Sequence, residues 1–308
     1  MLKYILGRVL LIIPTLILVV FVIFIILNIT PGDPGRIILG IQASQESVDE
    51  INAMLGMDRP LMVRFGNYLL DALRLDFGTS YRSRIPVFDE IMPRFPTTLT
   101  LAILAVAASA LIGIPLGIIS AVRKYSILDY SLTVSSLFIA AVPPFFLALI
   151  LMLIFALWLG ILPSSGIGSI RHFVLPVLTL ALPMAAFLAR MVRTSMLETM
   201  RQDYIRTAKA KGAGKNRVIV RHALKPALMP IITVLGMNFA ALLGGALITE
   251  IVFGLPGIGN VILTAVRMHD APIIMGSAVF LAVMFKAIML IVDIIQVIVD
   301  PRLKSRFG

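Results

Sequence analysis

The residues best suited to contacting a charged partner gather in one basic segment, residues 202–230. Ten Lys or Arg residues fall between Arg190 and Lys225, against two acids, Glu198 and Asp203. Long apolar runs flank the segment on both sides. Because charged side chains are costly in hydrocarbon, we expect this segment to be a loop outside the membrane. The pattern of basic and small residues in the segment suggests that the loop docks onto a partner.

Within this loop, residues 201–212 are predicted to form a short surface helix. They include good helix formers and no proline, and Gly212 and Gly214 are residues that can end a helix. Two positions of the helix are small, Ala208 and Ala210, and two carry large apolar or aromatic side chains, Tyr204 and Ile205. Basic side chains surround them, at Arg206, Lys209 and Lys211. Such a helix suits insertion into a groove of a partner protein. Lying on anionic lipid is the alternative.

Residue types that carry catalysis or bind metals are sparse in this chain. The absence of cysteine excludes disulfides and thiolate metal sites. The three histidines lie too far apart to form an i,i+4 ligand pair, at His172, His222 and His269. The only Gly-Lys pair precedes Asn216, and Lys209 stands where a phosphate-binding loop requires glycine. We therefore expect no catalytic residue, no metal and no cofactor bound by this chain.

The composition indicates a polytopic membrane protein. The chain has 308 residues, of which 59% are hydrophobic and 14% charged, whereas a soluble domain carries about 25% charged residues. The mean hydropathy is +1.01. The net charge of +11 is explained by basic residues collecting in cytoplasmic loops and near anionic headgroups. Membrane lipid, and no nucleic acid, is therefore the expected partner of these charges.

Six apolar runs reach the length of about 20 residues that a membrane helix needs. They are residues 9–29, 97–121, 132–159, 174–191, 228–248 and 273–299. The first is longer than the apolar region of a signal peptide, about 7–15 residues, so we interpret it as an uncleaved anchor. Pro143 and Pro144 interrupt the third run and should kink it. The prediction is an all-α membrane protein with six transmembrane helices.

Residues 30–96 are polar, with nine acids and seven arginines, and 48–56 and 60–75 have helical periodicity. We expect a small folded extramembrane region there. Placing the N-terminus inside puts 17 basic residues in the inner segments and only Arg171 and Arg267 in the two short outer loops. Since basic residues favour the cytoplasmic side, both termini are expected in the cytoplasm.

Short motifs along nearly the whole chain support one resemblance. They lie at residues 31–34 (Pro-Gly-Asp-Pro), 55–61, 76–80, 206–212, 221–230, 253–259 and 292–302. Their order and spacing resemble the dipeptide, oligopeptide, nickel and glutathione permeases of the binding-protein-dependent ATP-binding-cassette (ABC) importers. That family has Glu-Ala-Ala, three residues and Gly in its cytoplasmic loop. Arg206-Thr207-Ala208 and Gly212 occupy these positions here, so the glutamate is absent.

The resemblance implies a type I ABC importer permease in a bacterial or archaeal cytoplasmic (inner) membrane. It implies a second homologous permease in a heterodimer, two nucleotide-binding ATPase subunits that hold ATP and Mg, and an extracytoplasmic solute-binding protein. Residues 204–212 would be the coupling helix that docks on an ATPase and drives alternating access. Small peptides are the expected cargo, nickel chelates or glutathione are alternatives within the family, and an ion-coupled carrier is the alternative class.

These expectations divide the chain into four parts. They are an N-terminal transmembrane anchor helix (1–29), an extracytoplasmic region (30–96), a five-helix transmembrane core (97–300) with a cytoplasmic coupling loop (192–227), and a cytoplasmic tail (301–308).

Charges and helix breaks within the apolar runs indicate a gate or a translocation pathway. The candidates are Pro143, Pro144, Glu250, Gly254, Pro256, Gly257, Lys286 and Asp293. Intramembrane charges often face the interior of a bundle, and Lys286 and Asp293, seven residues apart, share one helix face. The same residues equally suit helix–helix packing or a hydrated interface, so both interpretations stay open.

Overall fold

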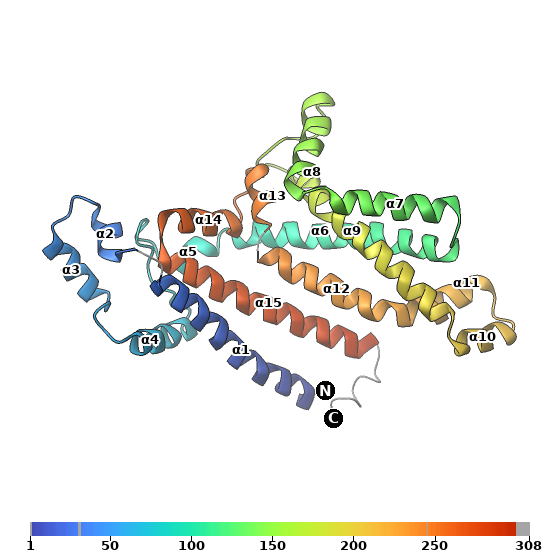
Figure 1. Ribbon diagram of the computed structural model, residues 1–308, viewed down its shortest axis with the longest axis horizontal. Coiled ribbons are helices and arrows are strands. Elements are labelled where there is room, and N and C mark those ends of the chain that lie inside the picture. Colours follow the sequence, from blue (N-terminus) through green and yellow to red (C-terminus); the bar gives the residue numbers. More distant parts are fainter. Residues whose placement is uncertain (1, 30–31, 245, 300–308) are drawn as a thin grey trace. The chain divides into compact units, whose positions relative to one another are not determined.

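The computed structural model describes residues 2–29, 32–244 and 246–299, and this part of the chain is almost entirely helical (Figure 1). One isolated bridge joins Thr79 to Pro86. Five helical segments are long and apolar enough to cross a membrane: Leu10–Ile29 in α1 (Leu2–Ile29), α6 (Phe95–Val122), α9 (Arg171–Met200), Lys215–Leu243 and α15 (Ala271–Val299). A bent pair of helices makes a sixth crossing if it counts as one span.

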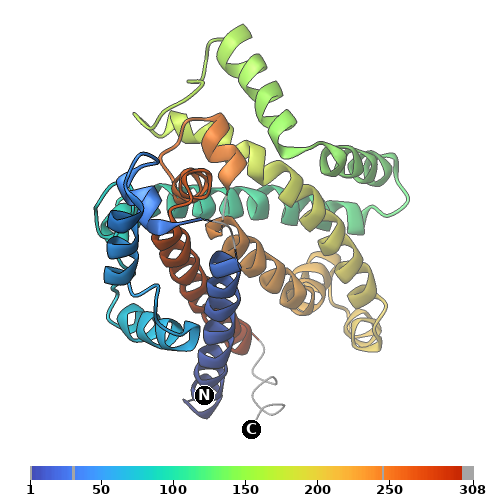
Figure 2. The same ribbon diagram turned by 60° about the vertical axis from the view of Figure 1, so that its left-hand side comes forward.

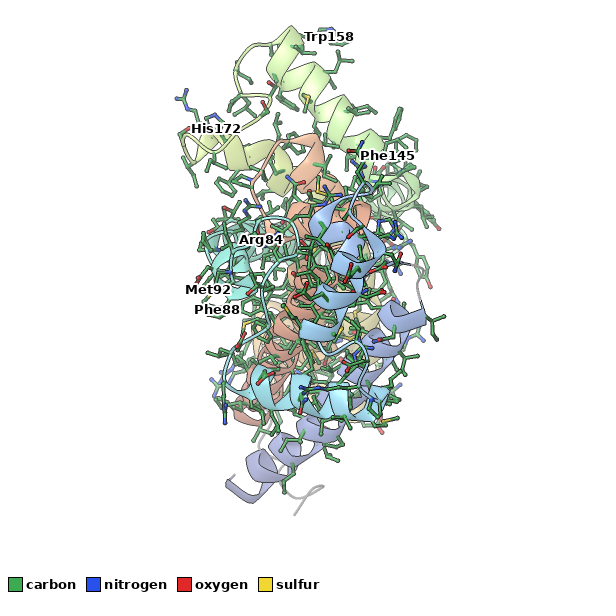
Figure 3. All side chains as sticks on the ribbon, turned by 90° about the vertical axis from the view of Figure 1, so that its left-hand side faces the viewer. Arg84, Phe88, Met92, Phe145, Trp158 and His172 are labelled. Atoms are coloured by element: carbon green, nitrogen blue, oxygen red, sulfur yellow. The ribbon has the colours of Figure 1, made fainter. Side chains whose placement is uncertain are left out.

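The expected kink in the third apolar run is present as a sharp bend between two helices. α7 (Ile127–Ala141) ends before the prolines, and α8 (Pro144–Leu151) continues into the π-helix η1 (Met152–Trp158) at 103° to α7. Val142 is extended, with φ −76 and ψ 125, because a following proline disfavours the helical region. Pro144 then starts the new helix, where its missing N–H costs no hydrogen bond. Trp158 lies at the end of η1 remote from the break (Figure 3).

Two other spans have bounds that differ from those predicted. α9 runs through residues 190–200, because charged residues end an apolar window without ending the backbone hydrogen bonding. The next span begins at Lys215 and comprises α11 (Lys215–Arg217), the π-helix η2 (Val218–Leu224) and α12 (Lys225–Leu243). It stops at Leu243, and α13 (Leu247–Val252) follows as a separate short helix. The expected end at residue 248 was therefore wrong.

Four short helices lie within residues 32–94. They are α2 (Pro34–Leu39), α3 (Gln45–Met54), α4 (Leu61–Leu73) and α5 (Val87–Ile91). Asp33 caps α2 by accepting hydrogen bonds from the N–H groups of Gly35 and Arg36, and Pro34 fits the first helical position. α3 and α4 confirm the two helices predicted from periodicity. Pro31 of the same motif lies outside the described residues.

The chain divides into two compact units, and the larger one contains residues 99–255 and 287–299. In this unit α7, α8, α12 and α13 pack against α9. Glycine allows close helix contact: a Cβ atom on Gly117 of α6 would lie 2.5 Å from the carbonyl oxygen of Ala189. A Cβ atom on Gly236 of α12 would lie 2.2 Å from Cγ2 of Val292. Residues 300–308, including the predicted tail, lie outside the described residues.

The second unit contains residues 2–98 and 256–286, including α14 (Ile258–Met268). Its core includes Phe24, Phe77 and Val87. α4 lies beside α1 (Figure 2), with the Phe65 ring centroid 5.5 Å from that of Phe24. The Ser80 hydroxyl donates a 2.6 Å hydrogen bond to the buried Asp270 carboxylate. This bond ties the loop before α5 to the junction of α14 and α15.

Candidate functional site

The predicted surface helix is present as α10 (Asp203–Ala210), between the end of α9 and α11 (Figure 1). Gly212 follows it with φ +81, a left-handed conformation that suits glycine. Its N–H donates a 2.9 Å hydrogen bond to the carbonyl of Lys209, and the N–H of Ala213 donates to the carbonyl of Ala208. The prediction that Gly212 ends this helix is confirmed.

One side chain anchors α10 to the helices around it. Ile205 is fully buried in a cluster that includes Val192 and Met196 of α9 and Val218 of η2. The neighbouring Tyr204 is 47% exposed, and partial burial raises the pKa of its phenol, so it stays neutral. One face of α10 is therefore fixed to the neighbouring helices by Ile205, while its other face is exposed.

The open face of α10 is basic. The Arg206 side chain is 79% exposed and lies 3.5 Å from the Asp203 carboxylate, which is 94% exposed. A pair this exposed contributes little to stability. Lys209 and Lys211 are exposed and have no ion pair within the described chain. The remaining predicted positions are on the same short helix, with Thr207 and Ala210 exposed and Ala208 half-buried.

We expect Ile205→Ala to loosen α10. Truncating a fully buried isoleucine costs about 2–5 kcal/mol, and here the loss falls on the one apolar anchor of a short helix. Because the chain has no cysteine, a single Lys209→Cys reporter can measure the thiol labelling rate, which should rise. Val220→Ala, at a position 63% exposed, is the control. Equal labelling rates in both variants would contradict the anchor.

A buried ion pair beside this anchor was not found from the sequence. Arg193 of α9 donates two hydrogen bonds to Asp129 of α7, at 2.7 and 2.8 Å, and the Asp129 side chain is 3% exposed. The Ser120 hydroxyl and, at 2.9 Å, the Tyr125 N–H complete the carboxylate's bonds. The only sequence signal was an acid in the short turn between two apolar runs. Nothing local indicates its partner.

The candidates for a gate lie on separate elements of the larger unit. Pro143 and Pro144 are exposed at the break between α7 and α8. Glu250 is fully buried on α13, which packs against α8. Gly254 follows α13 with φ +61, and the carbonyl of its neighbour Phe253 accepts a 3.0 Å hydrogen bond from the Gly166 N–H. Glycine at 254 therefore suits the positive φ of a turn next to the contact between two loops.

The other candidates lie on α14 and α15. Pro256 is half-buried, and Gly257 is buried at the position before the first residue of α14. Lys286 and Asp293 are both half-buried on α15, where their spacing places them on one face of the helix. Their partial burial suits either a pathway or helix packing.

Family comparisons cover nearly the whole chain. Residues 113–305 match the model described as binding-protein-dependent transport system inner membrane component, and residues 1–102 match the corresponding N-terminal model. The glutathione transport system permease protein GsiC of Salmonella typhimurium is 38% identical over 309 residues, 99% of this chain and 100% of that protein. The dipeptide transport system permease protein DppB of Alkalihalophilus pseudofirmus is 39% identical, with the same coverage of both chains.

Solved structures share the fold. The MetNI methionine ABC transporter, in an inward facing conformation, matches with a TM-score of 0.57 and 20% identity over 68% of this chain and 95% of that chain. An amino acid ABC transporter matches with a TM-score of 0.50 and 18% identity over 68% and 92%. This is the fold of a type I ABC importer permease. The chain belongs to the binding-protein-dependent transport system inner membrane components, and is a multi-pass transport permease of that family.

Proposed function

We propose that this chain forms, with a second homologous permease, a pathway for small peptides across the inner membrane. A solute-binding protein would deliver the cargo, and two partner ATPase subunits would hold and hydrolyse ATP. The relatives named for dipeptide and glutathione support this cargo, since both compounds are small peptides with free charged ends. Nickel chelates, or glutathione specifically, are the alternative cargo.

The observation that carries this proposal is the anchored, basic surface of α10. A helix that is to transmit a push must contact its partner on one face and be fixed to its own subunit on the other. Ile205 provides the fixed face, and Arg206, Lys209 and Lys211 provide the exposed one. Closing of the ATPase dimer would then move α10 and the spans together as a rigid body.

This function sets the sidedness of the chain. Both termini and residues 192–227 would be cytoplasmic, and residues 30–96 would be extracytoplasmic, around the core at 97–300. The gate or pathway would be drawn from the break after α7, the region of α13 and α14, and α15, that is from Pro143, Pro144, Glu250, Gly254, Pro256, Gly257, Lys286 and Asp293.

Reversing the charge of Arg206, Lys209 and Lys211 to glutamate should release the ATPase subunits. Three acids would replace the three exposed bases that face the partner, while Ile205 still anchors the helix. We expect co-purification of the ATPases to be lost and uptake of labelled dipeptide by cells to fall at least tenfold. A matched reversal of Lys215, Arg217 and Arg221, also exposed in the same loop, should retain both.

Unchanged co-purification and uptake in the α10 variant would contradict the coupling role. Uptake by the isolated chain, driven by an ion gradient in liposomes without ATPases, would support an ion-coupled carrier instead.

A further inference from the structure

A cleft in the second unit, lined by both apolar and charged residues, takes no part in the coupling proposed for α10. Its volume is about 890 Å³, which lies in the range of about 300–1,000 Å³ usual for small-molecule sites. All its lining residues belong to the unit of residues 2–98 and 256–286. The end of α1, the helices α2 to α4, the loop at 76–84 and the start of α15 form its walls.

α4 presents a polar stripe to this cleft. Arg64, Asn67, Tyr68 and Asp71 all line it, and their i, i+3, i+4, i+7 spacing places them on one helix face. The apolar stripe of the same helix packs against the core of the unit through Leu61, Phe65, Leu69 and Ala72, and Tyr68, at the edge of both stripes, packs on that core as well. Packing of that stripe on the core fixes which way α4 faces, so the polar groups are held toward the cleft.

The N-terminal end of the stripe suits a carboxylate. The Arg64 guanidinium lies 5.9 Å from the centroid of the Phe24 ring and contacts the Met57 sulfur at 2.7 Å. It has no carboxylate partner among the residues that the structure describes. The Tyr68 hydroxyl is buried and has no hydrogen-bond partner in the same part of the chain. A buried hydroxyl is costly to leave unpaired, so a small turn of the Tyr68 ring toward the cleft on ligand binding would let a ligand oxygen satisfy it.

Both phenols near Arg64 are donors at neutral pH. Burial raises the pKa of the Tyr68 phenol. Burial also raises the pKa of Tyr81, a larger effect than the lowering caused by the nearby charge of Arg64. Neutral tyrosine can donate its O–H to an anion, so three of the residues that line the cleft, Arg64, Tyr68 and Tyr81, carry donors.

The other end of the stripe suits an ammonium group. Asp71 is exposed and makes no ion pair within residues 2–29, 32–244 and 246–299. Arg59 and Arg84 also line the cleft without a carboxylate partner in that part of the chain. Figure 3 shows Arg84 on the loop that leads into α5. Charges of both signs therefore stand unneutralised in one cleft, which a ligand carrying both signs would match.

The spacing of these groups sets the length of the ligand. Arg64 and Asp71 are seven residues apart, which is about 10 Å along the helix axis. An extended peptide covers at most about 3.3–3.6 Å per residue. A peptide of about three residues therefore holds its terminal ammonium and carboxylate about as far apart as Asp71 and Arg64. A dipeptide is shorter than this, so it reaches both groups only when the Arg64 side chain turns from Met57 toward Asp71. A single amino acid is too short to reach both groups.

We propose that this cleft binds a di- or tripeptide with free ends, its carboxylate at Arg64 and the Tyr68 hydroxyl and its ammonium at Asp71. The assignment rests on the proposed function for its choice of peptides among doubly charged ligands. It adds a peptide site on the permease itself, separate from any site in the solute-binding protein.

The test measures binding of labelled tri-alanine to the assembled importer in nanodiscs, with the solute-binding protein left out. Free tri-alanine should bind, and acetylating its amino end or amidating its carboxyl end should weaken binding at least about tenfold. Arg64→Gln and Asp71→Asn should weaken binding of the free peptide to a similar extent. Arg74→Gln, directly after the same helix and outside the cleft lining, should bind like the wild type.

Two comparisons separate a ligand site from a merely structural role. Asp71→Asn should no longer discriminate between free and acetylated tri-alanine, whereas Arg64→Gln should still do so. Tyr68→Phe removes a hydroxyl that has no partner, so thermal stability should be kept while affinity falls.

Absence of tri-alanine binding to the wild type, or equal affinity for blocked and free peptide, would overturn the proposal. So would cleft variants that keep tri-alanine affinity but, in a separate assay with the solute-binding protein added, no longer bind that protein, which would make the cleft a protein-docking surface. The two proposals fail separately. A cleft without affinity for peptide leaves ATPase release by the α10 charge reversal unaffected, and retained ATPases leave the cleft measurements unaffected.

Discussion

Arg193→Met is expected to destabilise the protein by about 3–5 kcal/mol, the usual cost of breaking one side of a buried ion pair. The substitution leaves the Asp129 carboxylate 3% exposed without its bidentate partner. The remaining bonds, from Ser120 and Tyr125, do not neutralise its charge. Thermal or denaturant unfolding of the detergent-purified chain measures the loss.

A double-mutant cycle makes this prediction specific. Asp129→Asn combined with Arg193→Met removes both charges and should recover much of the stability, since a neutral replacement of a buried pair is often tolerated. Arg190→Met is the control, because Arg190 lies one turn earlier on α9 and has no carboxylate partner in the described chain. A loss below about 0.5 kcal/mol in Arg193→Met, the range of ordinary surface substitutions, would show that the pair is not important for stability.

Gly117→Ala is the second substitution with a large expected effect. The new methyl group would lie 2.5 Å from the carbonyl oxygen of Ala189 and 2.6 Å from Cβ of Val192. The carbonyl oxygen of Ala189 belongs to the helix backbone and cannot move aside as the end of a flexible side chain can. α6 and α9 would therefore have to separate. Overpacking of this kind costs about 1–3 kcal/mol, and the melting temperature should fall accordingly.

Gly66→Ala is the matched control for this change. Gly66 also lies inside a helix, α4, and a Cβ atom there would meet nothing within 4 Å. Alanine is favoured over glycine in a helix by about 1 kcal/mol, so this variant should be neutral or slightly more stable. Equal melting temperatures for the two alanine variants would contradict close packing of α6 on α9.

The ion pair and the glycine contact act on the helix that carries α10. Val192 of α9 contacts the Gly117 position and also belongs to the apolar cluster around Ile205. Arg193, the next residue, holds the start of α7. Under the proposed function, a displacement of α10 would therefore pass into α9 and from there into α6 and α7. Both variants should lower uptake more than they lower association with the ATPases.

Local signals explain which parts of this molecule could be predicted. Apolar length and proline position are properties of neighbouring residues, so the spans and the interruption at Pro143 and Pro144 were found. The 103° angle at that break was not, because it depends on what α8 packs against. The extension of α9 to Met200 was missed for a related reason. Charge ends an apolar window, while the helix continues through hydrogen bonds that hydropathy does not register.

The sequence by itself determined the membrane-spanning class, the basic loop and the end of its helix at Gly212. These follow from hydropathy, charge and backbone preference, which act over a few residues. Only the tertiary structure decided that Ile205 is an anchor, that Asp129 meets Arg193 across 64 positions, and that Arg64 and Tyr68 line a cleft. Each of these depends on helices distant in sequence packing together, and packing selects partners by shape and burial, which no local pattern encodes.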